Sequence, residues 1–333
     1  ETDLDALFRT RLFELTGGHP LYTAELMRGL QERGDLFRDS LGRWQAGRDL
    51  DWDSLPPRIE GVIAERVGRL PLDSRKLLQA AAVQGETFIA EVAAQALATD
   101  ETRVLSVLGN ELSRDHRLVR AQRLEHVGDG HDRQSTYQFH HYLFQKYLYD
   151  HLDRVEKARL HETTGEALAS RVGEEASEMS VQLARHFEAA GVLEKAVEFR
   201  LQAGNYAIKL AANDEAGRHF AHGLALLDDI PATLERAQLE LALQLGLGTA
   251  YQLADGYGSS EAQRAYGRAL DLCAQSGDSP QIVAALWPLA TYATMVGDLP
   301  QGVALAEQAL AIALKGEDPF FICVAHHHVG WIL

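Results

Sequence analysis

The chain has 333 residues, enough for two or three domains, and its composition of 46% hydrophobic and 24% charged residues is ordinary for a globular protein. Its formal net charge of −16 disfavours nonspecific binding to nucleic acid or to an anionic membrane surface. Two cysteines are too few for a disulfide framework, no apolar run reaches the roughly 18 residues that span a bilayer, and no signal peptide opens the chain, so we expect a cytoplasmic protein.

Residues 1–53 predict two short helices followed by a hairpin. Leucine and phenylalanine recur at helical spacing through residues 4–33, and the segment 16–20 (TGGHP) interrupts them. Glycine ends helices and proline suits the first turn of the next helix, so this interruption predicts a joint between two helices. Residues 35–52 predict a short hairpin with its turn near residues 40–42.

The next unit, residues 54–153, begins with a run of predicted helices. Apolar residues line a helix over residues 58–70, and Asp73 is placed to cap the helix that follows. We expect a short apolar helix from Phe88 to Leu97 and a longer one that Asp100 caps. The unit closes with a helix from Tyr142 to Leu152.

Two strand-like segments follow the third helix and predict a wing. They lie at residues 118–119 and 137–139 and bracket a polar loop that contains Gly128 and Gly130. Three helices followed by a two-stranded wing form the winged-helix arrangement. Its recognition helix would run from Asp100 to Asp115, but the first turn is acidic, and residues 54–152 carry 12 basic against 13 acidic residues. We therefore expect no nucleic-acid binding by this unit.

Residues 154–333 predict an α-solenoid of tetratricopeptide-like repeats. The pattern is a small residue, alanine or glycine twelve positions later, a large residue four further on and a small residue three after that. Small residues let neighbouring helices approach, and the large residue fills the gap between them. The four sets are Ala184, Ala196, Arg200 and Ala203; Gly204, Ala216, Phe220 and Gly223; Gly248, Ala262, Tyr266 and Ala269, with two extra loop residues; and Ala290, Gly302, Ala306 and Ala309.

Spacing within the array is irregular at its start. Ala196 and Ala216 are 20 residues apart, where the usual repeat is about 34 residues long. We expect one helix, Glu194 to Leu210, to serve the first two repeats. A fifth repeat starts near Gly330 and is cut off, and the chain begins without methionine, so we expect a piece of a longer protein.

Several short motifs resemble the region after the nucleotide-binding core of large bacterial signal-transduction ATPases of the AAA/STAND type. This group includes ATPase modules fused to adenylate or guanylate cyclase domains and maltose-regulator-like transcription activators. The resemblance covers nearly the whole chain, and its specificity lies in the order in which these short motifs follow one another. The matching segments are residues 17–22 (GGHPLY), 55–60 (LPPRIE), 70–71 (LP), 137–141 (YQFHH), 147–149 (YLY) and 183–191 (LARHFEAAG).

The resemblance implies a molecular switch with a P-loop ATPase core upstream as its partner. Residues 1–53 would be the helical lid of that ATPase module, with Gly18 and Pro20 matching a motif whose proline lies beside adenine. ATP or ADP would be bound by the full-length parent only, because no lysine here follows a glycine as the phosphate loop requires. Gly18 and Pro20 equally suit a plain helix joint.

Other candidate sites favour structural roles. His326, His327 and His328 are consecutive on a predicted helix and cannot converge on one metal ion. No catalytic motif surrounds any serine or cysteine, and we expect Cys273 and Cys323 to lie in the core. An aromatic set could line a peptide groove, although such residues more often belong to the repeat core; its members are Tyr251, Tyr257, Tyr266 and Trp287.

The sequence thus predicts an all-α regulatory and protein-interaction segment of a multidomain signal-transduction ATPase. It would couple nucleotide state to a repeat-based sensor surface that binds a protein or peptide partner, with no membrane contact and no catalysis by this fragment. Two alternatives stay open. One is a free-standing repeat adaptor, and the other is part of a transcription activator whose DNA-binding domain lies outside this chain. The output domain, the sensed ligand and the oligomeric state are not encoded in any motif here.

Overall fold

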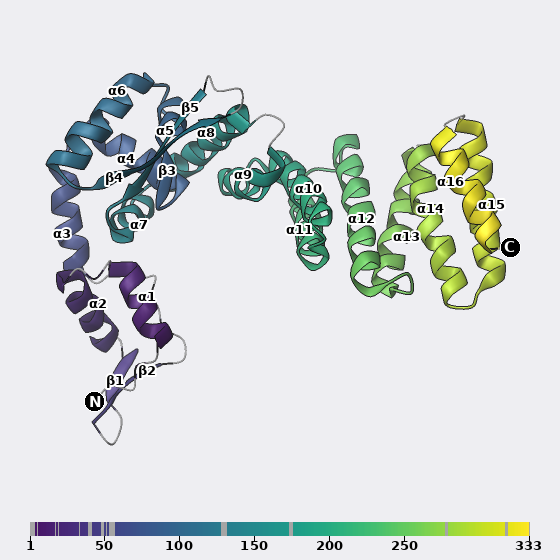
Figure 1. Ribbon diagram of the computed structural model, residues 1–333, viewed down its shortest axis with the longest axis horizontal. Helices are drawn as coiled ribbons and strands as arrows, with labels where there is room; N and C mark the ends of the chain where they lie inside the picture. Colours follow the sequence, from purple (N-terminus) through teal and green to yellow (C-terminus); the bar gives the residue numbers. More distant parts are fainter. Residues whose placement is uncertain are drawn as a thin grey trace. The chain divides into compact units, whose positions relative to one another are not determined.

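The computed structural model is mainly α-helical, with two small β-sheets and a helical repeat array, which confirms the predicted fold class (Figure 1). Its contacts divide the chain into two units, Glu1–Leu168 and Ala169–Leu333. The described residues are 4, 6–16, 18, 20–32, 34–38, 42–47, 50, 52, 57–127, 132–172, 176–276, 279–316 and 319–332. Gly17, His19, Pro56, Gly128 and Gly130, which belong to the predicted motifs and turns above, lie outside them.

The first unit contains eight α-helices among the described residues, one of them continuing as a π-helix, together with five strands. In chain order these are α1 (Ala6–Thr16), α2 (Pro20–Glu32), β1 (Leu36–Arg38), β2 (Trp44–Ala46), α3 (Pro57–Gly68), α4 (Leu72–Gln84), β3 (Thr87–Ile89), α5 (Ala90–Ala96), α6 (Glu101–Ser106) with the π-helix Val107–Asp115, β4 (Val119–Val127), β5 (Asp132–Phe139), α7 (Tyr142–Asp150) and α8 (Arg154–Val172). The last helix reaches across the division between the two units.

The lid segment folds as predicted, as two helices and an antiparallel hairpin. Strands β1 and β2 pair with Phe37 opposite Gln45. Beneath them Phe8, Leu30 and Leu36 are buried, and the ring of Trp52 lies 5.1 Å from that of Phe8. This small cluster lets a short hairpin persist, because two strands alone bury too little apolar surface to be stable.

The winged-helix unit has a three-stranded sheet, so the predicted two-stranded wing was incomplete. Strand β3 pairs antiparallel with β5, with Phe88 opposite Tyr137, and β4 pairs with the other edge of β5. The predicted helix from Phe88 therefore begins only at Ala90. Thr87, Phe88 and Ile89 are β-branched or aromatic, and Phe88 points into the core, so these three residues fit a half-buried strand.

Two predicted caps had opposite outcomes. Asp100 caps α6, since its Oδ1 accepts a hydrogen bond from the backbone N–H of Arg103 at 2.9 Å. Asp73 does not cap α4, because the helix starts at Leu72, two residues earlier than a cap at Asp73 requires, and Pro71 occupies the cap position. The Asp73 carboxylate instead accepts a hydrogen bond from the Arg103 guanidinium at 2.7 Å. Proline at this position fixes an extended entry into the helix without a side-chain cap.

The described part of the second unit contains only helices, which Figure 1 shows arranged in successive antiparallel pairs. These helices are α9 (Ala176–Ala190), α10 (Leu193–Lys209), α11 (Asn213–Leu226) with a 3₁₀ turn at Leu227–Asp229, α12 (Leu234–Asp255), α13 (Ser260–Ser276), α14 (Ser279–Met295), α15 (Leu299–Gly316) and α16 (Pro319–Ile332). All sixteen residues of the repeat pattern are buried, as predicted. Helix α10 runs without a break from Leu193 to Lys209, as predicted, and contacts both α9 and α11.

The two cysteines lie in different surroundings. Cys273 is buried in the core of the array, as expected, whereas Cys323 is exposed on α16, so its predicted core position was wrong. Most residues of α16 are apolar, so apolar spacing alone could not distinguish its buried face from the exposed position of Cys323. Within the described ranges, none of the helices is both long and apolar enough to cross a bilayer.

Candidate functional site

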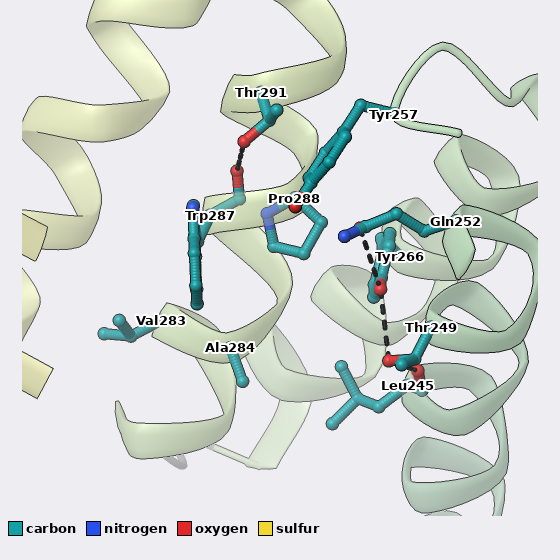
Figure 2. A pocket seen from close by; sticks show the side chains of 10 residues that line it. All are labelled: Leu245, Thr249, Gln252, Tyr257, Tyr266, Val283, Ala284, Trp287, Pro288 and Thr291. Atoms are coloured by element: carbon teal, nitrogen blue, oxygen red, sulfur yellow. Dashed lines mark hydrogen bonds between the residues drawn. The ribbon is translucent and has the colours of Figure 1, made fainter. Parts of the chain in front are cut away.

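The repeat array contains a pocket of about 320 Å³ between consecutive repeats. Helices α12 and α14 form its walls, Tyr266 of α13 lies between them, and Tyr257 reaches in from the loop after α12 (Figure 2). Its volume is within the range of small-ligand sites, which are mostly apolar with a few placed polar groups. The lining residues are Leu245, Thr249, Gln252, Tyr257, Tyr266, Val283, Ala284, Trp287, Pro288 and Thr291, and none of them is charged.

Three of the four aromatic residues singled out in the sequence line this pocket. Tyr266 is core, with 4% of its surface exposed, as favoured from sequence, but Tyr257 and Trp287 are 52% and 41% exposed. The core interpretation was therefore wrong for Tyr257 and Trp287. Tyr257 follows Gly256, which ends α12 with a φ of +88°, so this tyrosine belongs to a loop and not to a helix face. Tyr251 is partly buried and packs against the cluster around Tyr266 without lining the pocket.

Tyr266 can lie between the helices because Gly248 faces its ring. A Cβ atom at Gly248 would be 2.7 Å from Tyr266 Cε1, closer than side chains approach. The Tyr266 hydroxyl lies 3.2 Å from Thr249 Oγ1 and donates to Gln252 Oε1 at 3.3 Å (Figure 2). Burial raises the pKa of the Tyr266 phenol to about 12, so it stays neutral at physiological pH.

Pro288 stands inside α14, where proline is unusual. It has no N–H, so the carbonyl of Ala284, one turn earlier, lacks its usual helical donor. Both residues line the pocket, and Figure 2 shows the proline ring on the same helix as Trp287. Helix α14 therefore gives this wall the apolar ring of Pro288 beside the indole of Trp287. The sequence contained this signal, but proline alone did not distinguish a pocket wall from a bend.

Gly18 and Pro20, which the resemblance assigns to a nucleotide lid, lie in the first unit and make a helix joint. Gly18 has a φ of +71°, and a Cβ there would be 2.9 Å from the Phe13 ring, so only glycine fits without strain. Its N–H donates to Thr16 Oγ1 at 3.3 Å. Pro20 is the first residue of α2 and is exposed. This geometry suits a joint, and contact with adenine remains a prediction for both residues.

Two polar side chains of the candidate recognition helix bond to a neighbouring helix. Glu111 accepts a hydrogen bond from Ser74 Oγ at 2.7 Å, and Arg103 pairs with Asp73. Arg66 donates to the carbonyl of His116 at 2.7 Å. These contacts hold the helix against α3 and α4. Within the described part of the chain, no cluster of three or more histidine, cysteine, aspartate or glutamate residues is arranged to hold a metal ion.

No family model and no curated protein match the sequence. Among solved structures, the chain is similar to a Signal Transduction ATPase with Numerous Domains (STAND) protein with a tetratricopeptide repeat sensor from Pyrococcus horikoshii, with 12% sequence identity and a TM-score of 0.36. The match covers 99% of this chain and 54% of that protein, so this chain spans about half the length of its neighbour.

Proposed function

We propose that this chain is the regulatory and protein-interaction segment of a multidomain signal-transduction ATPase of the STAND type. In this proposal the repeat array is the sensor, and the lid and winged-helix unit connect it to an ATPase core. The supporting observation is the uncharged, aromatic-rimmed pocket between α12 and α14. A pocket with a few placed polar groups is the default binding-site hypothesis in a helical array without catalytic motifs.

Contacts within the first unit support a mechanical role for the lid. Tyr22 of α2 is buried, and its ring meets His141 edge-on at 5.2 Å and Phe144 of α7 at 6.5 Å. Leu15, Tyr22 and Leu26 of the lid share one hydrophobic cluster with Ile63 and Leu148 of the winged-helix unit. A shift of α2 on nucleotide binding would therefore disturb the core of that unit, since close-packed interiors transmit strain.

Coupling between the pocket and the ATPase is the first test. Ala284→Trp in the longer protein fills the pocket and mimics an occupant, and we expect it to change the rate of ATP turnover by about fivefold or more. The matched control is Ala304→Trp, at an exposed position on α15. If Ala284→Trp and Ala304→Trp both leave turnover at the wild-type rate, the array does not regulate the ATPase.

Nucleotide binding is the second test. The 333-residue chain should bind ATP or ADP only weakly, because it has no glycine-rich phosphate loop. Calorimetry that showed micromolar affinity or tighter would contradict this. In the longer protein, Pro20→Ala should weaken nucleotide binding, and an unchanged affinity would mean that α1 and α2 are not an ATPase lid.

The coding sequence on either side of the chain separates the proposal from its alternatives. A phosphate-loop motif upstream supports the ATPase, and its absence favours a repeat adaptor. A cyclase domain or a basic helix-turn-helix elsewhere in the same reading frame would identify the output.

A further inference from the structure

A second pocket, of about 240 Å³, lies in the first unit among helices α3, α4 and α7. Each of these helices contributes two residues four positions apart, which lie on the same face of a helix. The pair from α3 is small and leaves space, whereas the pairs from α4 and α7 are polar. These pairs are Ala64 and Gly68 of α3, Arg75 and Gln79 of α4, and Tyr147 and His151 of α7.

The guanidinium of Arg75 has no carboxylate partner within the described part of the chain. Its Nη2 donates a hydrogen bond to the carbonyl of Gly68 at 3.1 Å, and its Nε is buried without an acceptor. Buried donors without an acceptor are rare in folded proteins, and a bound ion is one of the few explanations for them. The positive charge of Arg75 is therefore not balanced by a neighbouring side chain.

The carboxylates of the three helices are already engaged elsewhere. Each of the four pairs with a different basic side chain: Glu60 with His151 at 3.1 Å, Asp73 with Arg103 at 2.7 Å, Asp150 with Lys146 at 3.0 Å, and Glu65 with Arg69. Among the described residues, none that lines the pocket is acidic. An external anion is therefore the partner that Arg75 lacks.

Tyr147 does not supply the negative charge either. Burial, and then the charge of Glu60, raise the pKa of its phenol, and the charge of Arg75 offsets this only in part. The phenol is therefore neutral at physiological pH. Its ring stacks on that of His151, with 3.9 Å between the ring centroids, so α7 gives the pocket a flat, uncharged wall beside the guanidinium.

The single unbalanced charge distinguishes between kinds of anion. A phosphate monoester carries about −1.5 to −2 at pH 7, whereas a carboxylate carries one negative charge, which one guanidinium balances. Carboxylate is also planar and matches the geometry of guanidinium donors. Val67 and Leu148, which are buried, complete the lining with apolar surface that suits a short hydrocarbon chain.

We propose that this pocket binds the carboxylate of a short-chain organic acid, with Arg75 as its counter-ion. The carboxylate lies at the guanidinium, and the hydrocarbon part packs against Val67 and Leu148. The acid is either a free small molecule or the side chain of a glutamate on a partner protein. This proposal does not depend on the sensor function, because it concerns a different pocket in the other unit.

The experiment compares four probes by NMR titration of the 333-residue chain. Butyrate, which reproduces a glutamate side chain up to its Cα, should bind and shift the signals of α3, α4 and α7. Butyramide, its neutral isostere, should bind at least about tenfold more weakly, because it forms no charge-assisted hydrogen bond. Inorganic phosphate should also bind more weakly than butyrate.

The fourth probe distinguishes the two sources of the acid. N-acetyl-glutamic acid α-amide carries the same side chain on a peptide backbone. If it binds more tightly than butyrate, the acid is a glutamate of a partner protein. If it binds equally or more weakly, the acid is a free small molecule.

One pair of variants tests the counter-ion. Arg75→Gln removes the charge and should weaken butyrate binding by about tenfold or more. Lys76→Gln is the matched control, since it removes the same charge from the next residue of α4, which is exposed and does not line the pocket. It should bind butyrate like the wild type, and thermal unfolding checks that both variants are folded.

A second pair tests the location without changing any charge. A Cβ at Gly68 meets nothing within 4 Å, so Gly68→Leu adds a side chain to the pocket lining without displacing a neighbour. It should abolish butyrate binding. Gly61→Leu is the control, because it also enters open space on α3 but lies outside the lining. This pair decides the question even if Arg75→Gln does not fold.

Four results would overturn the proposal. Butyramide binding as tightly as butyrate would show a neutral pocket, and phosphate binding more tightly than butyrate would show a site for a different anion. An affinity for butyrate that neither Arg75→Gln nor Gly68→Leu changes would place the binding elsewhere. The last is a folded wild-type chain that none of the four probes saturates.

Discussion

Arg200 Nη2 donates a hydrogen bond to Glu188 Oε2 at 2.9 Å and so joins helices α10 and α9. Arg200 is buried at the position where the repeat pattern calls for a large residue. The second Glu188 oxygen lies 3.1 Å from His222 Nε2 on α11, so a single carboxylate connects three helices. Burial would raise the pKa of Glu188, but hydrogen bonds from Arg200 and His222 outweigh it and hold that pKa below its usual value.

Glu188→Gln should destabilise the array by about 1–3 kcal/mol, because it leaves the buried Arg200 guanidinium without its carboxylate. A group whose folded pKa is lowered stabilises the protein above its unfolded pKa, so the Glu188 contribution should be lost as pH falls below about 4.5. Urea unfolding from pH 7 to pH 3 measures this. Glu198→Gln, at an exposed position of α10, is the control. If Glu188→Gln were as stable at pH 7 as the control Glu198→Gln, the assigned role of Glu188 would be contradicted.

His161 should make the first unit sensitive to acid. Its ring is buried, and its Nε2 lies 3.0 Å from the Tyr149 hydroxyl. Burial, and then the charge of Lys157, lower its pKa from 6.5 to about 4. As pH falls, His161 is therefore protonated in the unfolded chain before it is protonated in the folded chain. The free energy of unfolding should decrease by about 3 kcal/mol between pH 6.5 and pH 4. His161→Gln should flatten this part of the pH profile, and an unchanged slope would show that His161 is not its source.

Overpacking the last complete repeat should have local effects. Ala306 and Ala309 are buried, and a Cβ at Gly302 would be 2.5 Å from Thr294 Oγ1. Ala306→Leu should cost about 1–3 kcal/mol. Because each repeat touches only its neighbours, hydrogen exchange should show loss of protection in the array and not in residues 58–152. Equal loss in both regions would mean that the array is not a modular solenoid.

Phe220 lies between two glycines, and adding one methyl group should disturb it. A Cβ at Gly204 would be 2.4 Å from Phe220 Cε1, and one at Gly246 would be 2.7 Å from the same atom. Gly204→Ala should therefore destabilise the array by about 1–3 kcal/mol in denaturant titrations. Gly267→Ala is the matched control, because a Cβ there meets nothing within 4 Å, and it should stabilise by about 0.5–1 kcal/mol. Equal effects of the two substitutions would refute the argument from close approach.

Duplex DNA should not bind in a sequence-specific manner at physiological salt. The candidate recognition helix starts with Glu101 after the Asp100 cap, and Arg103 in its first turn is paired with Asp73. Specific readout needs basic or amide side chains directed at base edges. A gel shift that is sequence-specific at nanomolar protein would overturn this prediction.

Repeated local patterns were predictable from sequence, and features made by distant partners were not. The buried positions of the array follow from small residues at fixed spacing, since close helix contact excludes larger side chains. Strand β3 was missed because its three residues pair with β5, far along the chain. A groove lined by the aromatic set was raised from the sequence, but the repeat core was favoured for it. The exposure of Tyr257 and Trp287 depends on how two consecutive repeats meet, which no local pattern encodes.

The contacts of helix α10 also limit where a gene deletion or duplication within the array can end. Because it contacts both α9 and α11, a gene duplication or deletion that ends between these helices would leave one of them without its partner. The same holds further along the array, since α12 contacts α11 as well as α13, and α13 contacts α14. The pocket is lined from α12, α13 and α14, so a deletion that removed any one of these three helices would also remove part of its wall.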